Sequence, residues 1–197
     1  KYWPHTVRDY IETDTILYCP KATRTKPPGY GNGPDHRGST SFAWWTDYRY
    51  GDGIEVKFSG SYGKNGWIAH TKAEGWFGAT SEHFWHHTIE IDRPDTVPLI
   101  MDSAWFHPLP LHADPPPPQF DHVEPYGFGQ NMWLVAMDRH TATINVACMD
   151  GSARRVGLKG LWTLRWNPQW NRENRWTTAG EVRPGDWPAW MRNMEPY

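Results

Sequence analysis

The most constraining feature of the sequence is an Asp-Gly pair between two short alternating runs. Asp150-Gly151 separates the alternation of Thr143–Cys148 from a second run at 153–156. Asp-Gly forms tight hairpin turns because Asp tolerates left-handed backbone geometry and Gly adopts a positive φ at no steric cost. We therefore predict an antiparallel hairpin late in the chain, with Asp150 serving the turn itself.

Other patterns predict further short elements. Aromatic and alternating runs at 41–50 and 54–59 flank Gly51-Asp52-Gly53, which indicates a second hairpin. The run at 97–104 carries Pro98 near its beginning, where a strand tolerates a missing donor. We also expect a strand at 16–19, a turn cluster at 60–66, and helical segments at 4–11 and 158–165.

Aromatic side chains must fill the core of this chain. It contains 14 Trp, 9 Tyr and 7 Phe together with 18 Gly and 18 Pro in 197 residues. This composition predicts one domain, 1–197, with short strands, little helix and long loops. The formal net charge of −2 gives no basic surface for nucleic acid. No apolar run reaches the ~18 residues of a transmembrane helix, so none is expected.

Two segments differ in composition from the rest. Residues 105–130 are rich in proline and predict an extended surface arm, which is either a passive loop or a contact between subunits. Its central run is Pro115, Pro116, Pro117 and Pro118. Residues 166–197 form a Trp-rich C-terminal extension. An exposed row of Trp166, Trp170 and Trp176 would suit a glycan platform or a subunit interface.

Several motifs resemble one family in their order along the chain. His140, nine intervening residues and Asp150-Gly151 resemble the His-x9-Asp-Gly signature of prepilin-like proteins, abundant in Planctomycetes. The resemblance runs from about residue 3 to the C-terminus. The accompanying stretches are Trp3 with Tyr10, Tyr18-Cys19-Pro20, Ser61-Tyr62-Gly63-Lys64-Asn65-Gly66-Trp67, Val97-Pro98-Leu99-Ile100-Met101-Asp102-Ser103, Val156-Gly157-Leu158-Lys159 with Leu161-Trp162, and Asp186-Trp187-Pro188 with Trp190-Met191-Arg192.

The resemblance implies an α+β, pilin-like head, in which a short antiparallel sheet packs against the end of an N-terminal helix. In the family, the apolar first half of that helix anchors in the membrane and later forms the filament core. The sequence shows no such stretch, so the resemblance concerns the head. It implies a non-enzymatic extracellular or cell-surface subunit, exposed to the periplasm before assembly. Its partners would be copies of itself in a filament, or subunits of a type II secretion or type IV pilus-like assembly.

The cysteines and carboxylates add two expectations. Cys19 and Cys148 are either buried free thiols or one disulfide, and an extracellular location favours the disulfide. Some pseudopilin heads bind Ca²⁺ through loop carboxylates, so the resemblance keeps a calcium site open. Its candidate ligands are Asp102, Asp138 and Asp150, with Asp114 and Asp121 as further choices.

Histidines offer the remaining chemistry. His83 and His87 are four residues apart and would share a helix face, as zinc ligands do, with His86 between them. The stretch lacks the order of a zincin motif, and we interpret its histidines as packed or solvated, like His107, His112 and His122 of the proline segment. We interpret His140 as structural. A glycan-binding module is the alternative function, and a metal-dependent hydrolase is the weakest hypothesis.

Overall fold

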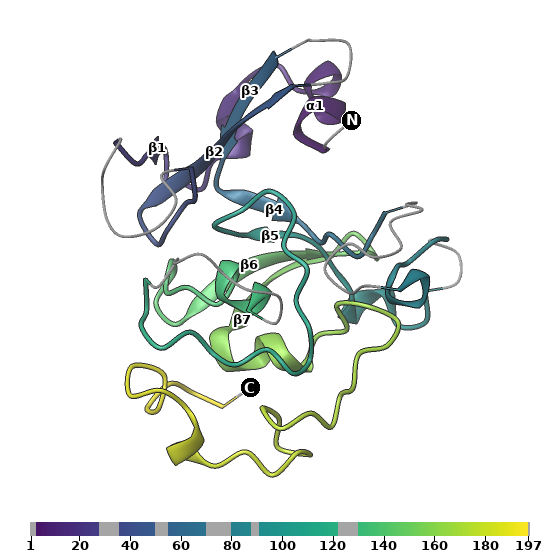
Figure 1. Cartoon of the computed structure of the whole chain (residues 1–197), viewed down its shortest axis with the longest axis vertical. Helices are drawn as coiled ribbons and strands as arrows, with labels where there is room; N and C mark the ends of the chain where they lie inside the picture. The colour runs from purple at the N-terminus through teal and green to yellow at the C-terminus, as the bar shows by residue number, and fades with distance from the viewer. Residues whose placement is uncertain are drawn as a thin grey trace.

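The described part of the chain forms two small β-sheets, with a C-terminal segment of irregular backbone beyond the second sheet (Figure 1). The computed structural model describes residues 3–27, 36–49, 55–69, 80–87, 91–121 and 130–196. The sheets have the orders β1-β2-β3 and β4-β5-β6-β7. Their strands are β1 Arg24–Thr25, β2 Phe42–Arg49, β3 Glu55–Gly60, β4 Tyr62–Lys64, β5 Pro98–Asp102, β6 Thr143–Cys148 and β7 Ala153–Gly157.

Both predicted hairpins are present. β2 and β3 pair antiparallel, and the turn predicted between them lies outside the described residues. β6 and β7 also pair antiparallel. In their turn, Gly151 has a φ of 85° and Asp150 Oδ1 accepts bonds from Ser152 N and Oγ at 2.9 and 2.7 Å. The Asp-Gly pair therefore acts as the sequence predicts.

Little of the described chain is helical. The helix α1, Trp3–Val7, continues into a 3-10 turn at Arg8–Tyr10. The longest 3-10 segment of the described residues covers Leu158–Thr163, and shorter ones lie at Asp14–Leu17, Ser81–His83, Pro94–Thr96, Asn131–Leu134 and Pro184–Asp186. None of the helices in the described ranges is long and apolar enough to cross a membrane. The α+β class, with short antiparallel strands and little helix, is confirmed.

Two local predictions were wrong. The strand expected at 16–19 is instead a 3-10 turn, Asp14–Leu17. Thr13 caps this turn, because its side chain accepts a bond from Thr15 N, and capping favours a helical start over a strand. The turn cluster expected at 60–66 contains strand β4, which pairs with β5.

The segment around β4 holds several elements together through polar side chains. Ser61 Oγ accepts a bond from Cys19 N at 2.8 Å and donates to Ala22 O at 2.7 Å. Asn65 Nδ2 donates to Pro98 O at 3.0 Å and to Trp166 O at 2.8 Å. Both side chains are buried, so these bonds satisfy groups that would otherwise destabilise the fold.

Tryptophan forms much of the largest core. One face of the second sheet packs against the C-terminal segment, where Trp162 and Trp187 meet edge to face with ring centroids 5.4 Å apart. The indoles also bond to the backbone: Trp67 Nε1 donates to Pro110 O at 2.7 Å, and Trp162 Nε1 to Asp114 O at 2.9 Å. Each ring thus contributes apolar area and satisfies a carbonyl.

The described part of the predicted proline arm lies along the protein. Trp133 Nε1 donates to Pro115 O and Trp190 Nε1 to Pro117 O, both at 2.8 Å. Pro116 and Pro117 are buried, whereas Pro118 is exposed. Carbonyls of a proline run have few backbone partners, because proline lacks an N–H, and here indoles supply them.

Gly63 provides a test of this close packing. A Cβ at Gly63 would collide with Trp105 O and would lie 2.7 Å from Ser103 Cβ and 2.9 Å from Pro108 Cδ. We expect Gly63→Ala to lower the free energy of unfolding by about 1–3 kcal/mol, through overpacking against backbone. Urea denaturation measures this, with Gly185→Ala as control because nothing lies within 4 Å of its added Cβ. Equal stabilities of the two variants would contradict the expectation.

Candidate functional site

Three chemistry-bearing side chains from distant parts of the sequence meet where the two sheets adjoin. Cys19 Sγ lies 3.2 Å from His140 Nε2, and the same nitrogen lies 3.2 Å from Asp102 Oδ2. The three ligand-type atoms lie within 4.8 Å of one another. Among the described residues, these are the three His, Cys or acidic side chains whose ligand atoms lie close enough to hold one metal ion.

His140 is held by a strained turn. Thr141 and Ala142 have φ values of 57° and 59°, which cost roughly 1–3 kcal/mol each for such residues. Three bonds hold the turn: Ala142 N donates to Asp138 Oδ1 at 2.7 Å, Leu158 N to Ala142 O at 2.9 Å, and Arg155 Nη2 to His140 O at 2.8 Å. The surrounding structure therefore fixes the backbone that presents the imidazole.

Asp102 is a fully buried carboxylate with a buried partner. Its Oδ1 lies 3.3 Å from Arg139 Nη1, and its Oδ2 accepts a bond from Asn145 N at 2.7 Å. Arg139 also donates to Ser61 O and to Ser39 O, each at 2.6 Å. A buried carboxylate requires such compensation, and Arg139 provides it while bonding residues that precede β2 of the first sheet and β4 of the second.

Cys19 is fully buried, and burial raises the pKa of its thiol. The predicted disulfide with Cys148 is not formed, because both cysteines are free and buried. Cys19 lies beside the His140 side chain, which contacts Asn145 on β6. Cys148 lies three residues further along that strand, on the opposite face, where it belongs to the main core. The two thiols therefore lie on different faces of β6.

The cluster does not have the order of a catalytic relay. In such a relay the two imidazole nitrogens serve different partners, one the nucleophile and the other the carboxylate. Here Nε2 faces Cys19 and Asp102 together, and Asn145 Nδ2 lies 3.1 Å from it as well. The side chains converge on one point instead of forming a chain.

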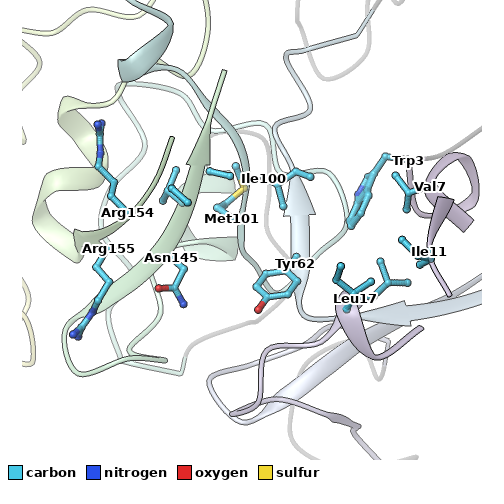
Figure 2. A pocket seen from close by; sticks show the side chains of 14 residues that line it. Trp3, Val7, Ile11, Leu17, Tyr62, Ile100, Met101, Asn145, Arg154 and Arg155 are labelled. Atoms are coloured by element: carbon cyan, nitrogen blue, oxygen red, sulfur yellow. The ribbon is translucent and has the colours of Figure 1, made fainter. Parts of the chain in front are cut away.

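An apolar groove of about 670 Å³ lies next to the cluster, and Figure 2 shows the side chains that line it. One wall is the N-terminal segment, with Trp3, Val7 and Ile11, and the other is the second sheet, with Ile100. Asn145 belongs to both features, because it lines the groove and contacts His140. The cluster and the groove are therefore neighbours.

The calcium site predicted from Asp102, Asp138 and Asp150 is not formed among the described residues. Asp150 serves the β6–β7 turn, whereas Asp102 and Asp138 act near the opposite end of β6. The other two candidate carboxylates, Asp114 and Asp121, accept hydrogen bonds from different parts of the chain. Asp114 Oδ2 accepts from Leu111 N and Met132 N, and Asp121 Oδ1 accepts from Thr40 N and Oγ1.

The other histidines do not converge into a metal site within the described ranges. His83 Nδ1 lies 3.0 Å from Thr80 Oγ1 at a 3-10 turn, and His86 Nε2 lies 2.9 Å from Ser81 O. His107 is buried against Phe106, and burial lowers its pKa to about 4. His122 lies outside the described residues.

The predicted exposed row of tryptophans was wrong. Trp166, Trp170 and Trp176 are 0%, 6% and 5% exposed and belong to the main core. The aliphatic residues are too few to fill that core, so the rings are needed inside. These three side chains are therefore not available as a glycan platform.

No family model, curated protein or solved structure matches this chain. The geometry of the cluster and the groove is therefore the basis for a functional argument. Sequence reasoning treated Cys19, Asp102 and His140 separately and missed Arg139 and Asn145. One signal was present: the three cluster residues all lie in stretches that carry the family resemblance.

Arg139 provides a stability test of the site. We expect Arg139→Met to lower the free energy of unfolding by about 3–5 kcal/mol, because it leaves the Asp102 carboxylate buried without its cationic partner. Urea denaturation at neutral pH measures the change. The exposed Arg172→Met is the control, with an expected change within about 0.5 kcal/mol. A loss at Arg139 as small as at Arg172 would contradict the role given to the buried pair.

Proposed function

We propose that this protein is a non-enzymatic structural subunit with a pilin-like head, which acts outside the cell by self-association. The observation that carries the proposal is the apolar groove between the N-terminal segment and the second sheet. Its walls carry apolar side chains, and burying them in a contact with another molecule would stabilise that contact. Such grooves are typical of protein contacts when they are open to solvent and flanked by polar residues.

The sheet wall is the face opposite the main core. Along β6, Ile144, Val146 and Cys148 are buried in that core, whereas Asn145 and Ala147 lie on the groove side. Strands alternate their side chains between two faces, and the N-terminal segment is what faces the groove side of β6 among the described residues. A second layer packed here would bury the rest of this face.

The second wall extends the apolar surface outward. Ile16 lines the groove and is 62% exposed, and Tyr10, next to the groove residue Ile11, is 86% exposed. Both belong to the short helical turns that follow α1. The apolar surface therefore continues from the groove onto the outside of the N-terminal segment.

Charge complementarity favours a second copy of the same chain as the occupant. Exposed Asp9 and Glu12 lie on the N-terminal segment, and exposed Arg154 and Arg155 lie on β7 across the groove. The acidic side of one copy can meet the basic side of another, which is a head-to-tail arrangement. Contacts of this kind extend into open filaments unless the rotation closes a ring.

The family resemblance supports the same arrangement. It implies a sheet packed against an N-terminal helix, and the groove lies between α1 and such a sheet. A copy of this chain would then pack between α1 and the sheet; another subunit of a type II secretion or pilus-like assembly is the alternative occupant. Because the tryptophan row is buried, no observation favours the glycan-binding alternative.

Ile16→Glu tests the groove as the contact. We expect the wild-type chain to associate with rising concentration, measured by sedimentation velocity and seen by negative-stain electron microscopy. A charge at Ile16 would weaken association at least about tenfold, since burying it unpaired in the contact is costly. The fold should be unaffected because Ile16 is 62% exposed.

The matched control is Phe120→Glu. Phe120 is also a large exposed apolar residue, at 56%, but it lies in the proline segment and does not line the groove. Association should be unchanged by this substitution. A wild-type chain that stays monomeric at all concentrations, or equal effects of the two substitutions, would refute the groove as the contact.

A further inference from the structure

The cluster of Cys19, Asp102 and His140 combines three different metal-ligating groups. A thiolate, an imidazole and a carboxylate together suit Zn²⁺ and similar divalent transition ions, whereas Ca²⁺ and Mg²⁺ prefer oxygen ligands alone. The three ligand atoms lie within 4.8 Å of one another. We propose that these residues form a zinc site, which is distinct from the calcium site expected from the carboxylates.

The spacing of the ligand atoms fits a tetrahedral ion. With Zn–S near 2.3 Å and Zn–N or Zn–O near 2.0–2.1 Å, ligand atoms in a tetrahedron lie roughly 3.3–3.6 Å apart. Sγ of Cys19 and Oδ2 of Asp102 each lie 3.2 Å from Nε2 of His140. These two separations are within a few tenths of an ångström of the tetrahedral values, and Sγ and Oδ2 lie within 4.8 Å of each other.

The convergence on a single nitrogen favours a shared cation over hydrogen bonding alone. Nε2 of His140 has one bonding direction in the ring plane, yet Cys19, Asp102 and the Asn145 amide all approach it within about 3.2 Å. A single N–H or a single lone pair at Nε2 cannot align with all three contacts at once. An ion placed among sulfur, oxygen and nitrogen would serve the three ligands together.

Outer contacts already orient each ligand. Arg139 and Asn145 N fix the Asp102 carboxylate, and Ser61 Oγ accepts from Cys19 N. Arg155 bonds the carbonyl of His140. Metal sites depend on such partners, which set the ligand orientation before the ion arrives. Arg139 binds Oδ1 and leaves Oδ2 facing the other ligands, so its charge does not occupy the metal position.

Three protein ligands leave one coordination position for water or for a donor from another molecule. Cys19 and Asp102 are fully buried, but the His140 side chain is 20% exposed. Asn145 contacts His140 and lines the groove, so we place the fourth position on that side. The site does not require self-association, and it stands or fails independently of the proposed contact.

Titration of the metal-free, reduced protein with Co²⁺ tests the proposal. Co²⁺ replaces Zn²⁺ in tetrahedral sites and reports a thiolate ligand through a sulfur-to-metal charge-transfer band in the near ultraviolet. We expect one Co²⁺ per chain, with that band, and its displacement by Zn²⁺. Wild-type protein that binds no stoichiometric Co²⁺, or binds it without the charge-transfer band, would overturn the proposal.

Cys19→Ser and Cys148→Ser form a matched pair, because both replace a buried free thiol. We expect Cys19→Ser to abolish the band and to weaken Zn²⁺ binding more than about 100-fold, since loss of an outer partner alone costs 10–100-fold. Cys148→Ser should bind like the wild type. Equal binding by the two variants would overturn the assignment of Cys19.

His140→Asn supplies a second ligand test at a partly exposed position. Saturating Zn²⁺ should raise the melting temperature of the wild type, since a ligand of the native state stabilises it. The rise should be absent in His140→Asn. Near-ultraviolet circular dichroism of the metal-free variants checks that they are folded. A full Zn²⁺-induced rise in His140→Asn would contradict the site.

Discussion

The structure depends on one buried ion pair, Arg139 with Asp102. Both side chains are withdrawn from water, where their charges are costly unless each polar atom finds a partner. Arg139 meets most of this requirement by bonding Ser39, which lies between β1 and β2, and Ser61, which lies between β3 and β4, although its buried Nε has no partner among the described residues. The pair thus joins the two sheets. Replacing either partner alone would leave the other charge buried and unpaired, which strongly destabilises a fold. The pair also fixes the carboxylate on which the cluster is built.

The two ends of the His-x9-Asp-Gly motif have separate roles at opposite ends of one strand. Asp150 and Gly151 close the turn after β6, through local hydrogen bonds and a positive φ. His140 precedes β6 and is presented by a second, strained turn at Thr141. The nine intervening residues are therefore the strand β6 with its flanking turn residues. The spacing follows from the length of the strand, while the histidine itself is placed by contacts with Cys19 and Asp102.

Much of the fold could be predicted from the sequence, because hairpins follow from patterns within a few residues. Contacts between residues far apart in the sequence could not be predicted in this way. Asp150-Gly151 and the alternating runs identify both hairpins because turn geometry and strand period act over a few residues. The meeting of Cys19 with His140 spans 121 residues and depends on Arg139, so no local pattern indicates it. The tryptophans were misplaced for a related reason. A ring such as Trp166 is amphipathic, and only the shortage of aliphatic residues indicates that it must be inside.

Asn145 links the cluster to the groove and so relates the two proposals. Its backbone N–H holds Asp102, while its side chain contacts His140 and lines the groove. A molecule packed in the groove would therefore touch a residue that orients two metal ligands, and an ion at the cluster would fix a residue of the contact surface. By linkage, any effect of the ion on association must equal the effect of association on ion affinity. The shared residue gives such coupling a direct route, which requires no movement of the sheets and no pathway through the core.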